Sequence, residues 1–251
     1  MKTHYHKITQ SNSLIEASFN LKLQERRLIL FALSRVKNLT EHNLVFEISP
    51  PEYAKVFEIN TDSSYRALRE TVNSLRDEKV WIHQEDGTKL DINWVTARAQ
   101  HPEGLVAIKL NEDLRPYLVN LQKNFTSYGI ENIVALNLKH SFRIYELLKQ
   151  YESIGTRLLE LDFIRDRLML SKSYDAFKLL RSKVIDPCVK EINESTDLLV
   201  SYVPVKSGRK IVALNFTINK NPERQNVIEI EQTDDMGGDE SIFDLDKAIL
   251  R

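Results

Sequence analysis

Residues 171–218, SKSYDAFKLLRSKVIDPCVKEINESTDLLVSYVPVKSGRKIVALNFTI, decide the fold that the sequence predicts. Apolar residues recur at spacings of three and four over residues 177–192, which is typical of a helix with one core-facing side. Ser173 can cap this helix, because its hydroxyl can accept a hydrogen bond from the free amides of the first turn. After the helix the apolar spacing changes to two, which predicts two strands joined by a basic turn at residues 206–210.

A helix followed by a basic-tipped hairpin is the plan of a winged helix-turn-helix. In such a domain the helix enters the major groove of DNA and the hairpin lies along the DNA backbone. The alternative is an ordinary helix packed on a hairpin, with its cations simply solvated. Under the first interpretation the basic residues of the helix and of the turn face DNA: Lys178, Arg181, Lys183, Lys206, Arg209 and Lys210.

The plan occurs twice in the chain. Residues 64–69, SYRALR, align with residues 173–178, SYDAFK, 109 positions later. Each copy is preceded by a predicted short strand and short helix, at 45–48 and 51–57 in the first copy and at 158–161 and 163–169 in the second. A period this long indicates two copies of one small domain, because a solenoid repeat has about 20–50 residues. The predicted fold class is therefore α+β, with tandem duplicated winged helix-turn-helix domains.

The first copy differs from the second in its charges. Its helix places four polar or basic residues on roughly one side: Arg66, Arg69, Asn73 and Arg76. This stripe is either a further DNA contact or a solvated face balanced by nearby carboxylates. The hairpin predicted after it has strands at 79–84 and 90–97 and an acidic turn at residues 85–87, and a further strand follows at 105–110. We therefore expect the second copy to bind DNA more tightly.

The chain length of 251 residues suits two small domains, since domains typically have about 100–150 residues. The predicted division is a flexible N-terminal tail, a first winged-helix domain, a second winged-helix domain and an acidic, disordered tail, at residues 1–12, 13–122, 123–221 and 222–251.

Three more helices are predicted, at residues 21–39, 112–125 and 141–151. The basic residues of the first of these are assigned to its exposed face: Arg26, Arg27, Arg35 and Lys37. Pro187 falls inside the helix of the second copy. It removes the hydrogen bond to the carbonyl of Lys183, which predicts a kink or an early end of that helix.

The net charge of −1 averages unlike parts of the chain. Residues 222–251 hold nine acidic and three basic residues, a net charge of −6, so residues 1–221 carry +5. A basic body with an acidic tail fits nucleic-acid binding. No apolar run approaches the roughly 18 residues of a membrane span, and the N-terminus lacks the apolar core of a signal peptide. The single cysteine, Cys188, lies on an apolar helix face, in keeping with a core position in a cytoplasmic protein.

Sites of catalysis are not evident in the sequence. His4-Tyr5-His6 has the spacing of a metal site in strand-nicking enzymes, but it lies in a polar segment without an apolar strand around it. Gly237-Gly238-Asp239-Glu240 resembles a cyclase signature without a domain to carry it. We predict no enzymatic activity, no cofactor and no metal. A nicking enzyme that uses a tyrosine such as Tyr5 with a metal ion remains as an alternative class.

Several segments together resemble the iteron-binding replication initiators of bacterial plasmids, over about residues 12–217. The most specific are Leu21-x-x-x-Glu25-x-Arg27-Leu28, Phe125-x-x-Tyr128-x-Ile130-Glu131, Phe142-Arg143-Ile144-Tyr145-Glu146-Leu147-Leu148, and Val189-Lys190-Glu191-Ile192-Asn193 leading to Tyr202 and the Gly208-Arg209 turn.

The resemblance implies that the second domain reads repeated origin sequences (iterons) in double-stranded DNA, while the first supports dimerisation and auxiliary DNA contacts. By position, the DNA-binding residues that it implies in the second domain are Lys178, Arg181, Ser182 and Lys183 in the helix and Lys206, Arg209 and Lys210 in the turn. It implies monomers that start replication and homodimers that can repress the protein's own promoter. A host initiator protein, the replicative helicase and chaperones are the implied partners, and the bacterial cytoplasm is the implied compartment, in association with plasmid and nucleoid. A winged-helix transcription regulator without a role in replication is the alternative function.

Overall fold

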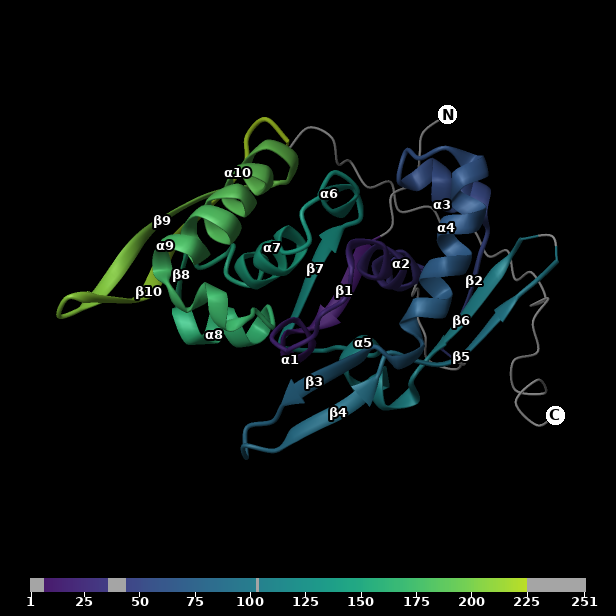
Figure 1. Ribbon diagram of the computed structural model, residues 1–251, viewed down its shortest axis with the longest axis horizontal. Coiled ribbons are helices and arrows are strands. Elements are labelled where there is room, and N and C mark those ends of the chain that lie inside the picture. The colour runs from purple at the N-terminus through teal and green to yellow at the C-terminus, as the bar shows by residue number, and fades with distance from the viewer. Residues whose placement is uncertain (1–6, 36–43, 103, 225–251) are drawn as a thin grey trace.

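The computed structural model describes residues 7–35, 44–102 and 104–224. Figure 1 shows a unit of helices and strands at each end of the long axis, with helices α2 (Leu23–Leu33) and α7 (Ser141–Lys149) between them. The acidic tail predicted at residues 222–251 lies outside the described residues from 225 onward.

The right-hand unit in Figure 1 is the first winged-helix domain. Its elements are β2 (Val45–Ile48), α3 (Pro50–Val56), α4 (Thr61–Ser74), the 3₁₀ turn η1 (Leu75–Asp77), β5 (Val95–Gln100) and β6 (Val106–Leu110). The strands pair antiparallel in the order β2-β6-β5. The sheet therefore places the last strand of the unit in its centre.

The left-hand unit repeats this plan. Its elements are β8 (Thr156–Glu160), α8 (Leu161–Arg167), the 3₁₀ turn η3 (Lys172–Asp175), α9 (Phe177–Leu180), the π-helical turn η4 (Arg181–Ile185), α10 (Asp186–Ser195), β9 (Leu198–Ser207) and β10 (Lys210–Lys220). The strand order is β8-β10-β9, which again places the last strand in the centre. The predicted tandem duplication is confirmed.

The two copies also share the turn that follows their first helix. Glu58 after α3 and Met169 after α8 both take a left-handed backbone, with φ of 51° and 48°. In each turn the next amide reaches back five residues, from Ile59 to the carbonyl of Ala54 and from Leu170 to the carbonyl of Arg165. This is a Schellman motif, which satisfies carbonyl groups left free at a helix C-terminus.

The first copy contains an insertion that the sequence interpretation misassigned. The strand predicted at residues 90–97 is two strands, β4 (Lys89–Asn93) and β5, separated at Trp94. β4 pairs with β3 (Lys79–His83) in a two-stranded ribbon, and β5 belongs to the domain sheet. By topology the first domain's wing is thus the β5–β6 hairpin. The acidic turn at residues 85–87 is the tip of an extra ribbon.

The middle of the molecule corrects two further predictions. Residues 7–11, predicted as part of a flexible tail, form β1 (Lys7–Ser11), which pairs antiparallel with β7 (Phe125–Gly129). The helix predicted at 112–125 is shorter. Its helical parts are η2 (Glu112–Leu114) and α5 (Arg115–Leu118). Positive φ angles at Asn120 and Asn124, 55° and 53°, turn the chain toward β7.

Two short helices complete this middle part, α1 (Asn12–Ile15) after β1 and α6 (Glu131–Val134) after β7. Buried apolar side chains of the middle part and of both winged-helix domains form one continuous core. Cys188 lies in it at 2% exposure, as predicted, and burial raises the pKa of its thiol to about 12. Among the described helices, none has the length and apolar character needed to cross a membrane.

The basic face predicted for the first long helix is wrong. Arg26 and Arg27 on α2 are 3% and 6% exposed, and each guanidinium is directed toward other elements of the middle part. Amphipathic spacing alone could not reveal this, since the partners of both residues lie more than 100 positions away in the sequence. Arg35 forms an ion pair with Glu52 on α3, and Lys37 lies outside the described residues.

Candidate nucleic-acid interface

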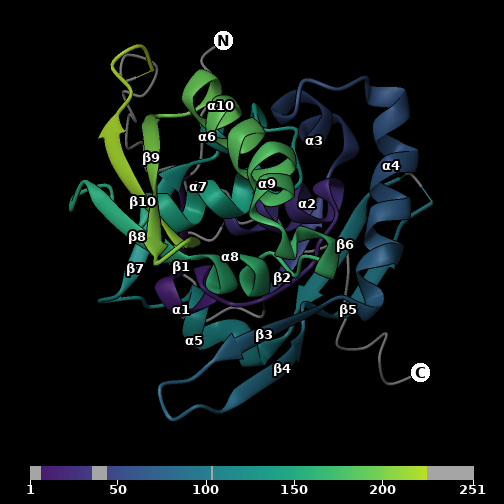
Figure 2. The same ribbon diagram turned by 60° about the vertical axis from the view of Figure 1, so that its left-hand side comes forward.

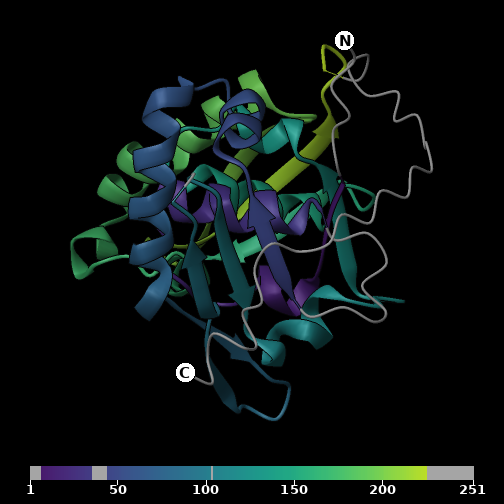
Figure 3. The ribbon, with the colours of Figure 1, turned by 90° about the vertical axis from the view of Figure 1, so that its right-hand side faces the viewer.

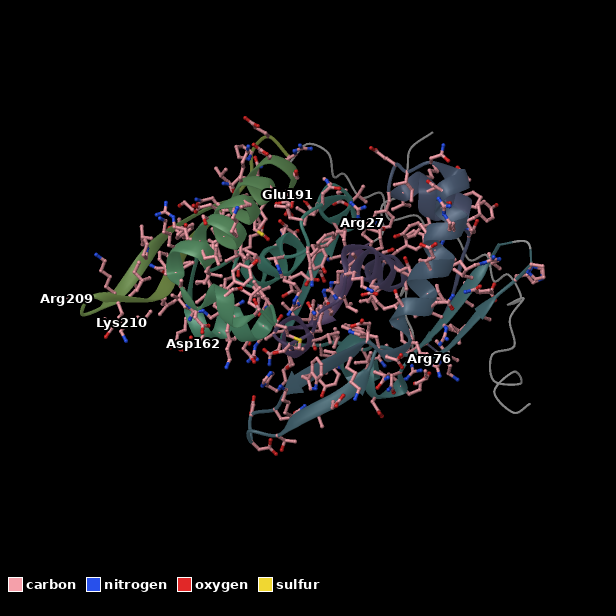
Figure 4. All side chains as sticks on the ribbon, viewed as in Figure 1. Arg27, Arg76, Asp162, Glu191, Arg209 and Lys210 are labelled. Carbon is pink, nitrogen blue, oxygen red and sulfur yellow. The ribbon has the colours of Figure 1, made fainter. Side chains whose placement is uncertain are left out.

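Arg165 stabilises the helix-turn-helix of the second domain through hydrogen bonds. Its guanidinium donates to the carbonyls of Tyr174 (3.1 Å) and Asp175 (2.8 Å) in the turn, and to the carboxylate of Asp162 (2.6 Å) on its own helix. Asp162 is labelled in Figure 4 at the start of α8. Arg165 therefore holds α8 and the start of α9 at a fixed separation. No sequence pattern indicated this role, because the acceptors in the turn are backbone carbonyls.

The second helix of this motif begins later than predicted. Ser173 lies in the 3₁₀ turn, where its hydroxyl contacts that of Ser171 at 2.6 Å, and it does not cap the helix. The helix starts at Phe177, so Lys178, Arg181 and Ser182 fall within its first turns. In helix-turn-helix proteins the N-terminal residues of this helix contact base edges. All four candidate readers of this helix, including Lys183, are exposed.

The kink or early end predicted at Pro187 is wrong, because the helix accommodates the proline with a π turn instead. The amide of Asp186 donates to the carbonyl of Arg181, five residues back, and Pro187 lies in the first turn of the α-helical segment that follows. A proline is tolerated at such a position, because the first amides of a helical segment need no partner within it. Figure 2 shows α9 and α10 continuing along one line beside the β9–β10 strands, so the helix does not end early.

Arg181 is held on the helix surface by a carboxylate. Its Nε lies 3.1 Å from Oδ2 of Asp186, and the hydroxyl of Tyr202 on β9 donates to Oδ1 of the same carboxylate. The charge of Asp186 raises the pKa of Arg181. Burial, together with the carboxylate, raises the pKa of Tyr202 to about 12, so the phenol is a donor at neutral pH. This cluster links the second helix to the wing.

The wing presents its cations at the tip of a long hairpin. Lys210 pairs with Ser207, which leaves a two-residue turn of Gly208 and Arg209. Gly208 has a φ of 60°, a conformation that glycine adopts without steric cost. Lys206, Arg209 and Lys210 are all exposed, and Figure 4 shows the last two at the far end of the hairpin.

In the first domain α4 presents the predicted stripe. Arg66, Arg69, Asn73 and Arg76 are all exposed. Two residues of the adjacent strand β5 reach this stripe and were missed by the sequence interpretation. Arg98 Nε and Gln100 Nε2 lie 3.4 Å and 3.3 Å from the side-chain oxygen of Asn73. A polar groove of about 630 Å³ lies beside them, lined by Arg76, Asp77, Asn93, Val95, Thr96, Ala97, Arg98 and Asn111.

The two helices lie along one side of the molecule. In Figure 3 the blue helix α4 and the green helical segments of the second domain are both on the left, while the sheet of the first domain lies to the right of α4. The wing of the second domain extends beyond its helices at the left end of Figure 1. Such an arrangement can follow a duplex over two successive stretches, one for each domain.

A buried charge cluster joins the middle part behind this face. Glu146 on α7 is fully buried and forms ion pairs with Arg26 on α2 and, at 3.2 Å, with Arg143. Gln10 on β1 donates to the same carboxylate at 2.6 Å, as does the hydroxyl of Tyr128 on β7. Burial raises the pKa of Glu146, but the two guanidinium groups more than offset this, so the net shift is downward.

A second connection runs from α2 to the helix of the second domain. Arg27 donates to the carbonyl of Leu136 at 2.9 Å, and the next amides of that loop, of Asn137 and Leu138, donate to Glu191 on α10. Arg27 and Glu191 are labelled in Figure 4. The orientation of α10 is therefore tied to the centre of the molecule.

Metal-binding clusters of histidine, cysteine, aspartate or glutamate are absent from the part of the chain that the structure describes. His4, Tyr5 and His6 lie outside that part, as does the glycine pair at 237–238.

Comparison with known proteins agrees with the architecture. Residues 7–149 match the family model "Initiator Replication protein, WH1", and residues 160–218 match "Initiator Rep protein, WH2". An Escherichia coli replication initiation protein is 26% identical over 242 residues, which are 92% of this chain and 76% of the relative. An uncharacterised 27.6 kDa protein of the same organism is 26% identical over 223 residues, covering 83% of this chain and 93% of the relative.

A solved structure has the same fold. The crystal structure of the Pi initiator protein in complex with iteron DNA matches with a TM-score of 0.72 and 22% identity, covering 86% of this chain and 98% of that one. The two family models together cover most of the chain, in the order in which the two winged-helix domains occur. The chain therefore belongs to the family of replication initiator proteins.

Proposed function

We propose that this protein starts plasmid replication by binding tandem repeats at the origin, as the Pi initiator binds iteron DNA. The observation that carries the proposal is that α4 and the second-domain helix lie along one side of the molecule, and that the basic residues predicted on these helices and on the wing are exposed. The proposed role is non-enzymatic.

Within this proposal the residues have different tasks. Lys178, Arg181, Ser182 and Lys183 contact base edges in the major groove, because they lie at the start of the second helix. Lys206, Arg209 and Lys210 hold phosphates along the adjacent backbone. Arg66, Arg69, Asn73 and Arg76 hold the neighbouring stretch of duplex through the first domain.

The proposal extends to assembly and partners. Residues 13–122 and 123–221 act as two domains, the first supporting dimerisation and the second reading the origin. Monomers open the origin, and homodimers repress the protein's own promoter. A host initiator protein, the replicative helicase and chaperones are the proposed partners in the bacterial cytoplasm, on plasmid DNA. These assignments rest on membership of the initiator family.

The test is capture of sheared DNA from the source plasmid by the purified protein, followed by sequencing of the retained fragments. Moderate salt is needed, because non-specific phosphate binding weakens steeply as salt rises. We expect retention of one locus with tandem direct repeats about two helical turns apart. Retention of scattered single operators would instead identify a transcription regulator, and the absence of any retained fragment would contradict the winged-helix assignment of the DNA face.

A further inference from the structure

The carboxylate of Asp186 lies on the same helix as the exposed basic residues Lys178, Arg181 and Lys183. It lies between Arg181 on the helix and Tyr202 at the base of the wing, and it accepts a hydrogen bond from each of them. A negative charge at this place repels DNA phosphates, so on grounds of charge alone it weakens binding. Its two hydrogen bonds indicate a different role, which is to fix the side chain of Arg181.

The π turn is the feature that brings Asp186 to Arg181. In an α-helix successive residues advance by about 100°, so residues five apart point about 140° away from each other. In the π turn the amide of Asp186 bonds to the carbonyl of Arg181 itself, which places the two residues on one side of the helix. The π turn next to Pro187 therefore brings the carboxylate of Asp186 beside the exposed side chain of Arg181.

Tyr202 anchors this arrangement to the core. Its ring packs against the fully buried ring of Phe216 with the centroids 5.5 Å apart, and its hydroxyl points to Asp186. The phenol is thus fixed at one end and donates at the other. Asp186 in turn is held from the wing side, and the position of its second oxygen, which accepts from Arg181, is fixed.

The bond made by Nε determines which edge of Arg181 remains for a ligand. A guanidinium presents its donors as a planar fork, and with Nε engaged the two terminal nitrogens form the outer edge. That edge matches two neighbouring acceptors in one plane. In the major groove guanine presents such a pair, O6 and N7, whereas adenine presents one acceptor and one donor.

We propose that Asp186 and Tyr202 are positioning residues that orient Arg181 for bidentate contact with a guanine of the recognised sequence. This inference rests on the proposed function, because it assigns a base to one of the proposed readers. Under this proposal Asp186 increases the preference for the recognised sequence, although its negative charge weakens binding to DNA of any sequence.

The experiment measures the affinity of the wild-type protein for the captured duplex and for a random duplex of equal length, at one salt concentration. Asp186→Asn should lower the ratio of the two affinities by roughly three- to tenfold, because the orientation of Arg181 is lost. The affinity for random DNA should stay equal or rise, since a negative charge is removed. Tyr202→Phe should lower the ratio in the same direction while it keeps the ring on Phe216.

A double-mutant cycle separates positioning from other effects. In an Arg181→Ala background, Asp186→Asn should leave the ratio unchanged, because the residue to be oriented is absent. Glu194→Gln is the matched control: it removes an exposed carboxylate 3.8 Å from Lys190 on the same helix and should leave the ratio unchanged. Thermal melts of all variants identify any loss of fold.

Replacing each guanine of the captured repeat in turn identifies the base. One replacement should weaken wild-type binding and have a smaller effect on Asp186→Asn. A high wild-type ratio that Asp186→Asn leaves intact, or an equal fall of both affinities, would overturn this inference and leave the proposed function standing. A wild-type ratio of one would overturn the proposed function and the inference together.

Discussion

The two winged-helix domains share one plan and differ in the segment after their second helix. In the first domain α4 is a regular α-helix of 14 residues, and the inserted β3–β4 ribbon separates it from the wing. In the second domain the helix widens into the π turn and leads directly into the basic wing β9–β10. The same fold has been adapted in the first case by insertion and in the second by a local change of helical register.

The inserted ribbon meets the other domain. His83 of β3 lies 2.6 Å from a guanidinium nitrogen of Arg167 on α8, and Ser18 bridges His83 (3.1 Å) and Asp166 (2.8 Å). Burial and the charge of Arg167 lower the pKa of His83, so its ring is neutral at physiological pH. A hairpin that directly follows the second helix can therefore join domains in one copy and form the basic wing in the other.

The largest expected effect concerns the middle part that both domains share. Glu146→Ala removes the carboxylate between two buried guanidinium groups, which should lower the free energy of unfolding by about 3–5 kcal/mol. Urea denaturation monitored by circular dichroism measures the change. If the core is continuous across both domains, one cooperative transition should shift as a whole.

The control for this change is the exposed pair of Lys190 and Glu194. Glu194→Gln should alter stability by less than about 0.5 kcal/mol. Separate transitions for the two domains in the wild-type protein would contradict the shared core, whatever the size of the Glu146 effect.

The contribution of Glu146 should also depend on pH. Its pKa in the folded protein lies below the ordinary value of 4.5, so the stabilisation is present above pH 4.5 and is lost as pH falls through the folded value. The difference in stability between the wild-type protein and Glu146→Ala should therefore narrow below pH 4.5. If the difference in stability between the two proteins stayed constant down to the pH at which the protein unfolds, the side chain of Glu146 would contribute through packing alone.

These buried charges mark the limit of prediction from the sequence. The apolar spacing of the second helix and of most strands, and the repeated order of elements, can be recognised in the sequence, and the structure confirms them. The roles of Arg26 and Arg27 depend on partners more than 100 positions away, so their basic character was mistaken for exposure. Trp94 interrupts a continuous strand pattern because its two sides join different sheets, which a pattern in one chain does not show.

For the candidate site, the sequence predicted which residues are exposed but not which residues contact one another. Every proposed reader is exposed, because polar residues at helical spacing opposite an apolar stripe face solvent. The sequence did not indicate that Arg98 and Gln100 reach Asn73, or that Asp186 holds Arg181. Those contacts depend on a strand register and on a π turn. The DNA roles of these residues stay predictions.

The next effect in size separates base reading from backbone binding. Arg181→Ala should weaken binding to the captured duplex by roughly five- to hundredfold and change binding to random DNA much less. Arg69→Ala on α4 should weaken binding to both duplexes by a similar, smaller factor, because phosphate contacts carry no sequence information. Fluorescence anisotropy with the two duplexes gives both numbers. Equal losses for Arg181→Ala on the two duplexes would contradict its role as a base reader.

A smaller effect is expected at the wing. Lys210→Ala should weaken binding to all DNA and lower the slope of log affinity against log salt by about one, since one phosphate contact is lost. A salt titration from low to moderate concentration measures this slope. The matched control is Lys190→Ala, which removes an exposed cation from helix α10. This change should leave the salt slope unchanged. A loss confined to the captured duplex would place Lys210 on a base instead.

The smallest effect tests the assignment of the extra ribbon. Asp86 lies at the acidic tip of β3–β4, where its carboxylate accepts from the amide of Thr88 at 2.8 Å. If this ribbon were a wing lying on DNA, Asp86→Asn would remove a repulsive charge and raise the affinity for every duplex. Because the ribbon is inserted before the wing and packs toward α8, we expect affinity within about twofold of wild type and an unchanged salt slope. A clear rise in affinity would indicate that the β3–β4 tip lies against DNA. The extra ribbon would then act as a wing, and the proposed difference between the two domains would be wrong.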